Sequence, residues 1–149
     1  MTETEEKRLP YRRTWQELRD QAIERNDADP DGALNAPELI GAFKEAFRDF
    51  LLTCFSESIR LEIGTAWAPL EGLDGARLIA REKLRLLPSD TDQMDAPALA
   101  RILHRELHSF TLPQKAFEAC HGDLCDMALY PMLKPHDPTA AKTSWSDAL

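Results

Sequence analysis

The sequence predicts an all-α protein, an irregular bundle of about five helices with flexible termini. Apolar residues recur at helical spacing along most of the chain, and clusters of proline, aspartate and glycine separate the helical stretches. The 149 residues are 43% hydrophobic, which is enough to build one core. We therefore expect a single helical domain over residues 14–131, between a flexible segment, 1–13, and a proline-containing tail, 132–149.

The first helix is expected over Thr14–Arg25. Thr14 is placed to cap its first turn, and Glu17 follows three residues later, which is the spacing of a capping box. Trp15 lies on the apolar side of this helix. An acidic turn follows, and Asn35 is then placed to cap the next helix.

The second helix, predicted over Ala36–Ser58, is the longest and is apolar over a wide arc of its surface. Such a helix lies either at the centre of a bundle or against a partner protein. We take its apolar face as the candidate partner-binding surface, with Trp67 and Trp145 as additional contacts. The face comprises Leu39, Phe43, Phe47, Phe50 and Phe55.

The segment Ile59–Ile63 alternates apolar and charged residues, which is the period of a short strand. Further helices are expected over Asp74–Leu87, from Asp95 through Phe110, and over Gln114–Leu129, each bounded by proline or turn residues. One short strand cannot form a sheet alone, so the predicted class stays all-α.

The chain carries 26 acidic and 18 basic residues, a net charge of −8. Binding to nucleic-acid phosphates or to an anionic membrane surface needs basic clusters, so this composition argues against both classes. No apolar run reaches the roughly 18 residues that span a membrane. The first ten residues lack the apolar segment of a secretory signal, and the three cysteines are an odd number, so we expect a cytoplasmic protein with reduced thiols.

Residues 27–38 place oxygen-bearing side chains at alternate positions around Gly32. Calcium prefers six to eight oxygen ligands, and alternate residues of a tight loop can turn their carboxylates inward. The spacing resembles that of the EF-hand calcium loop, and with its flanking helices the resemblance covers residues 14–50. The resemblance implies calcium ligands from Asp27, Asp29, Asp31, the backbone of Ala33, Asn35 and Glu38.

Two features depart from the EF-hand pattern. Pro30 stands at the fourth loop position, where an EF-hand has a left-handed backbone that proline cannot adopt. The corresponding later loop, residues 87–98, has leucine and alanine at its first and last positions, where ligands would be needed. The alternative is that the aspartates only solvate a turn, while Asn35 caps the following helix.

A second candidate metal site combines histidines and cysteines. His104 and His108 are four residues apart, so a helix would place them on one face, a spacing that can bind zinc. Cys120 and Cys125 would complete a four-ligand site, although the spacing matches no named zinc motif. The alternative places the histidines on a solvated edge and the cysteines in the core.

The sequence lacks a nucleophile elbow, a glycine-rich phosphate loop and a dinucleotide fingerprint, so we expect that the protein is not an enzyme. We expect an intracellular binding or regulatory module that acts through protein–protein contacts, with another protein or with itself. The alternative function is that of an EF-hand-like calcium-binding protein. No cofactor is assured; calcium is the first candidate and zinc the second, and neither nucleic-acid nor membrane binding is expected.

Overall fold

The structure, a computed structural model, describes residues 9–139. All regular elements in this range are helices, which confirms the predicted all-α class. Residues 1–8 and 140–149, with Trp145 and most of the predicted flexible ends, lie outside the described residues. In chain order the elements are α2 (Tyr11–Arg25), α3 (Pro37–Ile63), α4 (Asp74–Leu84), α5 (Pro88–Thr91), α6 (Ala96–Ile102), α7 (His104–His108), α8 (Gln114–Asp126), α9 (Tyr130–Leu133) and a 3₁₀ turn, η1 (Lys134–His136).

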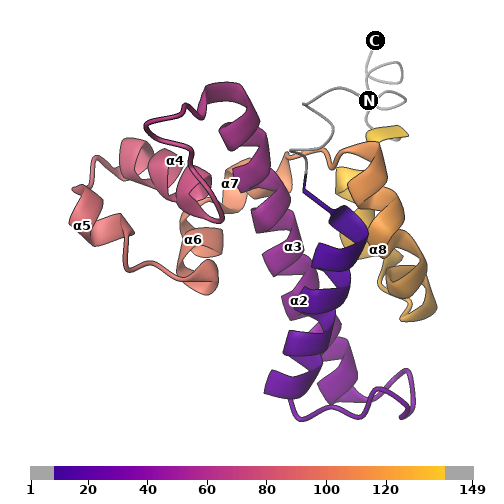
Figure 1. Cartoon of the computed structure of the whole chain (residues 1–149). Helices are drawn as coiled ribbons and strands as arrows, with labels where there is room; N and C mark the ends of the chain where they lie inside the picture. The colour runs from indigo at the N-terminus through magenta and orange to yellow at the C-terminus, as the bar shows by residue number, and fades with distance from the viewer. Residues whose placement is uncertain (1–8, 140–149) are drawn as a thin grey trace.

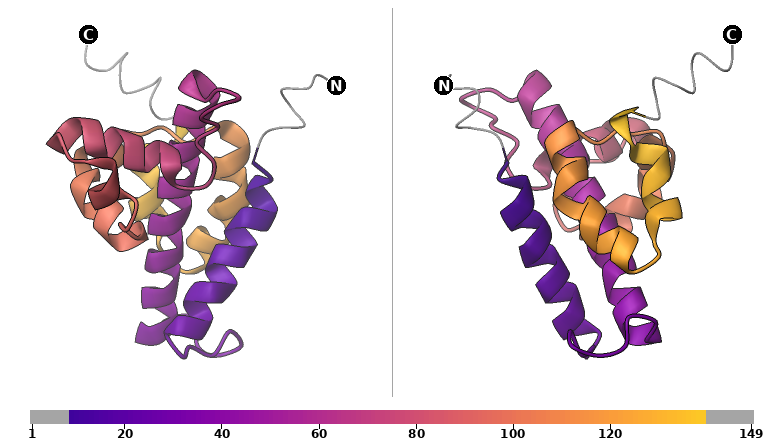
Figure 2. Two further views of the ribbon diagram at one scale, coloured as in Figure 1. Left: turned by 60° about the vertical axis from the view of Figure 1, so that its left-hand side comes forward. Right: turned by 90° about the vertical axis from the view of Figure 1, so that its right-hand side faces the viewer.

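Helix α3 is the centre of the bundle, in contact with α2, α4, α6, α7 and α8. Helix α2 packs antiparallel against it to form a hairpin, and α4, α5 and α6 lie together on the opposite side of α3 (Figure 1). The C-terminal elements α8 and α9 lie side by side next to this hairpin (Figure 2). The central position explains why α3 is apolar over so wide an arc.

The core is centred on two aromatic residues from the hairpin. The rings of Trp15 and Phe50 meet edge to face with centroids 5.5 Å apart, and both side chains are buried. The Trp15 indole N–H donates to Oδ2 of Asp123 at 2.8 Å, which satisfies a buried polar group. Arg19 donates to the same oxygen at 2.8 Å, so one carboxylate ties α8 to α2.

The two N-terminal caps differ from the prediction. Helix α2 begins at Tyr11, and the Thr14 N–H already donates within the helix to the Pro10 carbonyl oxygen at 2.9 Å, so Thr14 is not a cap. At the start of α3 the cap position is Ala36 and no side chain caps the helix, so the predicted role of Asn35 is also wrong. Proline occupies the first turn there, where its missing N–H needs no partner.

The sequence leaves open whether Ile59–Ile63 is a short strand; the segment is helical, because α3 continues through it. Extending an existing helix adds one hydrogen bond per residue without a new nucleus, whereas a lone strand has no partner. Arg60 also donates from Nε to Glu57 one turn earlier, at 2.9 Å. The helix ends at Gly64, where an added Cβ would lie only 2.5 Å from the Arg60 carbonyl oxygen.

The later helices are shorter than predicted. Helix α4 ends at Leu84, because Arg85 takes the left-handed conformation with φ of 55°. The helix expected from Asp95 is divided at Leu103 into α6 and α7. Asp95 does cap α6, since its carboxylate accepts the Ala98 N–H at 3.1 Å.

The described part of the predicted tail, residues 132–139, belongs to the fold. Helix α9 extends into it and the turn η1 lies within it, and Leu133 and His136 are 0% and 5% exposed. The Leu112 N–H donates to the His136 carbonyl oxygen at 3.0 Å, which ties this segment to the loop before α8. The predicted domain boundary at residue 131 is therefore too early.

Candidate functional site

A groove lies between α3, α7 and the C-terminal elements α9 and η1, with contributions from α6. We name it the basic groove. Its volume of about 370 Å³ is in the range of small ligand-binding pockets. It is lined by Lys44, Phe47, Arg48, Leu51, Ala100, His104, Leu107, His108, Pro131, Met132, Pro135 and His136.

The floor of the basic groove is apolar. Phe47 and Leu51 lie one turn apart on α3, Leu107 comes from α7, and all three side chains are buried. The elements α9 and η1 form the third wall of the groove, and Met132 and Pro135 are its apolar part. A floor of this kind favours a ligand that brings an aliphatic or aromatic group.

Two walls of the groove carry basic side chains. Lys44 and Arg48 lie four residues apart on α3, and His104 and His108 lie four residues apart on α7. The two imidazole rings are nearly parallel, at 10°, with centroids 6.4 Å apart, and both side chains are exposed. Arg48 Nε donates to Oδ1 of Asp49 at 2.9 Å, whereas Lys44 forms no ion pair with any carboxylate in residues 9–139.

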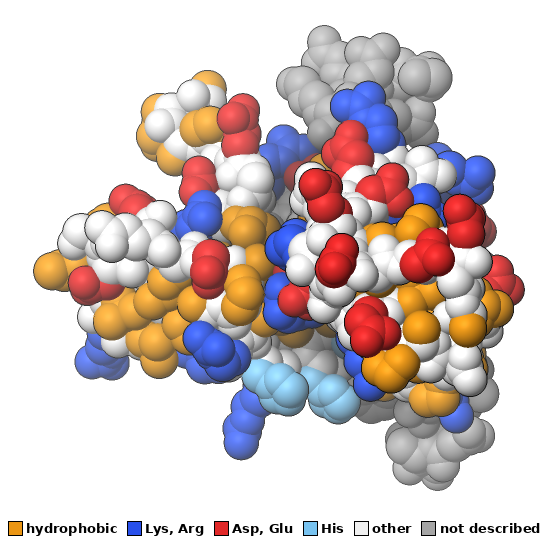
Figure 3. Space-filling model, turned by 90° about the horizontal axis from the view of Figure 1, so that it is seen from below, with side chains coloured by type: hydrophobic (Ala, Val, Ile, Leu, Met, Phe, Trp, Pro, Cys, Tyr) orange, Lys and Arg blue, Asp and Glu red, His pale blue; other side chains and the backbone are white. Residues whose placement is uncertain are grey.

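The groove reverses the charge of the chain locally. Its described lining holds one lysine, one arginine, three histidines and no aspartate or glutamate, although acidic residues outnumber basic ones by 26 to 18 in the whole chain. Figure 3 shows histidine side chains on the lower face beside hydrophobic ones, apart from the main group of acidic side chains. Such a local reversal favours a negatively charged ligand.

His136 holds the third wall in place through a hydrogen bond. Its Nδ1 lies 2.7 Å from the carbonyl oxygen of Phe110, an acceptor, so this nitrogen carries the proton and donates it. The His136 ring also contacts Phe47, with centroids 5.6 Å apart. Burial lowers the pKa of His136 below its ordinary value, because desolvation disfavours the imidazolium form.

Two larger hollows are less suitable as a site. One, of about 690 Å³, lies between α2 and α8, and the other, of about 760 Å³, lies beside the end of α3. Leu9 and Pro10 line both, so both border residues 1–8, which the structure does not describe. The lining of the basic groove, by contrast, includes neither the first nor the last described residue.

The chain matches no family model, no curated protein and no solved structure. Among residues 9–139, no helix is both long enough and apolar enough to cross a membrane.

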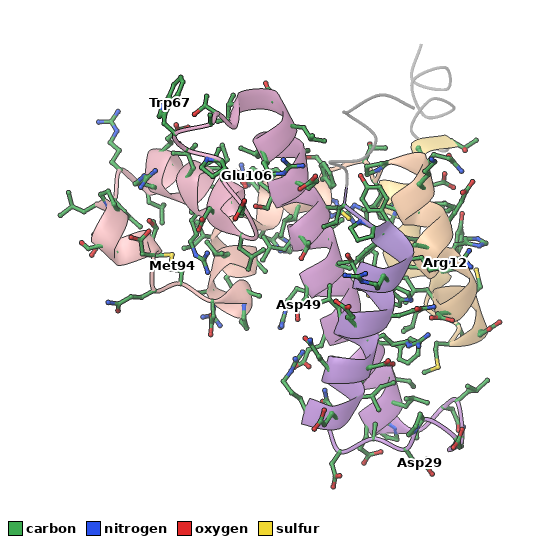
Figure 4. All side chains as sticks on the ribbon, viewed as in Figure 1. Arg12, Asp29, Asp49, Trp67, Met94 and Glu106 are labelled. Carbon is green, nitrogen blue, oxygen red and sulfur yellow. The ribbon has the colours of Figure 1, made fainter. Side chains whose placement is uncertain are left out.

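The predicted calcium loop connects α2 to α3, and Asp29 lies near its outer end (Figure 4). Asp27 ends α2 in the left-handed conformation, with φ of 50°. Its N–H donates to the Glu24 carbonyl oxygen, and the next N–H, of Ala28, donates to that of Ile23. These two bonds form a Schellman motif, so Asp27 serves as the residue that terminates the helix.

The other proposed calcium ligands are not drawn together. Asp29 Oδ1 accepts the Asp31 N–H at 3.0 Å, and the Gly32 N–H donates to the Asp29 carbonyl oxygen at 3.1 Å. Asn35 and Glu38 are exposed. In the part of the chain that the structure describes, no three His, Cys, Asp or Glu side chains form a group able to hold a metal ion. In this structure the loop is a hydrogen-bonded turn in which Asp27, Asp29, Asp31 and Glu38 are exposed.

The four proposed zinc ligands are also separate. His104 and His108 are adjacent, but they line the basic groove. Cys120 is buried in α8, and burial raises the pKa of its thiol to about 12. Cys125 is exposed, and its sulfur lies 3.4 Å from Nε2 of His121. The two histidines are thus surface residues and Cys120 is a core residue, whereas Cys125, which the alternative also placed in the core, is exposed.

The predicted partner-binding face is not a free surface. Its members pack inside the chain and are between 0% and 8% exposed; they are Leu39, Phe43, Phe47, Phe50 and Phe55. Phe47 alone among them also lines the basic groove. Trp67, by contrast, is 87% exposed on the loop after α3 (Figure 4).

Sequence reasoning missed most of the basic groove. The signal was present, because Lys44 and Arg48 flank Phe47 on one helix and His104 and His108 flank Leu107 on another. Each pair has the four-residue spacing that places basic groups beside an apolar position on one helix face. The third wall was assigned to a loose tail, which concealed the site.

Proposed function

We propose that this chain is a non-enzymatic binding module that holds an acidic, partly apolar segment of another protein in the basic groove. The observation that carries the proposal is an apolar, acid-free groove with basic walls on a chain of net charge −8. An apolar side chain of the partner would rest on Phe47 and Leu51. Carboxylates on either side of it would meet Lys44 and the two α7 histidines.

The shape of the groove favours a peptide segment. Lys44 and Leu51 are seven residues apart on α3, so that wall is about 10 Å long at 1.5 Å per residue. Two helical turns of wall can hold several consecutive residues of a partner, as when one helix lies in a groove between others. The basic side chains of the groove, Lys44, His104 and His108, are exposed, so a partner can reach them without a rearrangement of the fold.

The test is binding of a fluorescently labelled, end-capped peptide, Glu-Asp-Leu-Phe-Asp-Glu, followed by fluorescence polarisation. We expect saturable binding that weakens as salt is added, because exposed charge pairs are screened. Lys44→Glu should weaken binding by about tenfold, equivalent to about 1.4 kcal/mol, since it puts a carboxylate against the ligand.

The matched control is Arg101→Glu, which makes the same change of charge on α6, outside the groove lining. This variant should bind like the wild type. A peptide with lysines in place of its acids should not bind. Equal affinity for the acidic and basic peptides, or equal weakening by both variants, would contradict the proposal.

A further inference from the structure

The loop that connects α2 and α3 has the chemistry of a groove ligand. Asp27, Asp29 and Asp31 are exposed, and none of them forms an ion pair with a described basic side chain. Leu34 follows them at 57% exposure, a large apolar side chain in water. The loop therefore presents an apolar group beside unpaired carboxylates.

The loop is also held in one shape. The Schellman motif at Asp27 fixes its beginning, and the Asp29 carboxylate holds the Asp31 N–H in its middle. Near its end, the Ala36 N–H donates to the Ala33 carbonyl oxygen at 3.0 Å. A ligand that is already ordered loses less conformational entropy on binding.

We infer that the groove is occupied by this loop from a second copy of the chain, with Leu34 on the apolar floor and Asp31 against Lys44. This inference rests on the proposed function and names the partner. The charges are complementary, since Lys44 on one side and Asp31 on the other both lack ion-pair partners within residues 9–139.

Each of two copies can place its loop in the basic groove of the other. The view from below, toward the end of the molecule that carries the loop, shows both acidic side chains and histidines on one face (Figure 3). When each of two copies donates its loop to the other, the contacts are equivalent and the assembly closes as a two-fold dimer. The expected product is thus a dimer rather than a filament.

The test measures molar mass by light scattering over a series of protein concentrations. We expect the mass to rise from 16.9 kDa toward twice that value with concentration, and to fall when salt is added. Lys44→Glu and Asp31→Lys should each weaken dimerisation at least about tenfold. Asp29 is left unchanged because its carboxylate holds the loop.

Two combinations separate a lost contact from a damaged fold. The double variant Lys44→Glu/Asp31→Lys should dimerise more strongly than either single variant, because the swapped charges attract again. An equimolar mixture of the two single variants should form a heterodimer, because one keeps the native loop and the other the native groove. Leu34→Ser should weaken dimerisation, whereas Leu87→Ser, at a position 67% exposed elsewhere, should leave it unchanged.

A monomeric wild type that still binds the acidic peptide would overturn this inference and leave the proposed function standing. A wild type that dimerises as strongly as Asp31→Lys would also overturn it, because the contact would then lie elsewhere. Failure of both the peptide and the mass experiment would overturn both proposals.

Discussion

His136 is a buried, titratable side chain in the third wall of the basic groove. It is 5% exposed, its Nδ1–H is committed to the Phe110 carbonyl oxygen, and desolvation lowers its pKa. An unfolded histidine titrates near 6.5, so below this pH the unfolded chain takes up a proton more readily than the folded chain. The contribution of His136 to the free energy of unfolding therefore falls as the pH decreases below that value.

The prediction is that His136→Gln reduces this pH dependence. Urea unfolding of the wild type and the variant at about pH 7.5 and about pH 5.5, on either side of the ordinary histidine pKa, gives the loss of stability for each. Between the two pH values, the wild type should lose more free energy of unfolding than His136→Gln. His121→Gln, at a half-buried position on α8, is the control and should keep the wild-type loss. Equal losses in wild type and His136→Gln would show that another group is responsible.

At the scale of elements, the contact between α3 and α4 depends on close backbone approach. Ser56 is fully buried, and its hydroxyl donates to the Gly72 carbonyl oxygen at 2.8 Å and accepts the Ala76 N–H at 3.0 Å. A Cβ at Gly75 would lie 2.6 Å from the Ser56 carbonyl oxygen. Since backbone atoms cannot move aside cheaply, glycine is required at this position.

Gly75→Ala is therefore expected to destabilise the protein by about 1–3 kcal/mol, the usual cost of overpacking. Gly122→Ala is the matched control, because Gly122 also lies within a helix and an added Cβ there meets no atom within 4 Å. It should stabilise the protein by about 0.5–1 kcal/mol through lower entropy of the unfolded chain. Denaturant unfolding measures both; two changes of the same sign would contradict the role assigned to Gly75.

Local periodicity predicted the longer helices, but it missed the short ones, α5 and α9, and the packing that distant contacts decide. The apolar spacing around Trp15 and Phe50 identified α2 and α3, because helix faces repeat along the sequence. The alternation in Ile59–Ile63 is typical of a strand, but the segment is helical because the helix before it continues. The packing of Leu133 and His136 was missed because their partners lie far away in sequence, as the His136 bond to Phe110 shows.

The same limit applies to the site at the scale of the whole molecule. The sequence shows that Lys44 and Arg48 share a helix face, and that His104 and His108 share another. It does not show that the two faces line one groove, because nothing in a local pattern places α7 against α3. The sequence therefore offers the histidine pair either as part of a zinc site with Cys120 and Cys125 or as a solvated edge, and it does not indicate the groove.

The two sides of α3 are packed with unequal amounts of apolar surface. Trp15 and the phenylalanines of α3 form the core with α2 and α8, whereas α4 contributes only Gly75, Ala76 and Ala80 as buried residues. In Figure 1, α4, α5 and α6 project together to one side of α3. Because stabilisation scales with buried apolar area, this group of helices is held less strongly than the hairpin.

We expect α4 and the residues around α5 to open at a lower free energy than the rest of the fold. Native-state hydrogen exchange should show faster exchange for amides in α4 than for those in the middle of α3. Gly75→Ala should speed exchange in α4 further, whereas amides of α2 and α8 should speed by no more than the loss of global stability explains. Exchange in α4 at the free energy of global unfolding would contradict this picture.

The behaviour of α7 in that experiment decides whether the basic groove moves with α4. Helix α7 follows α6 directly, but Leu103 and Leu107 are 0% and 5% exposed, and α7 contacts α3. This packing should keep α7 protected when α4 opens, so that the histidine wall stays opposite Lys44. If α7 exchange in Gly75→Ala increases by more than the loss of global stability explains, opening of α4 disturbs the groove, and the same variant should then bind the acidic peptide more weakly.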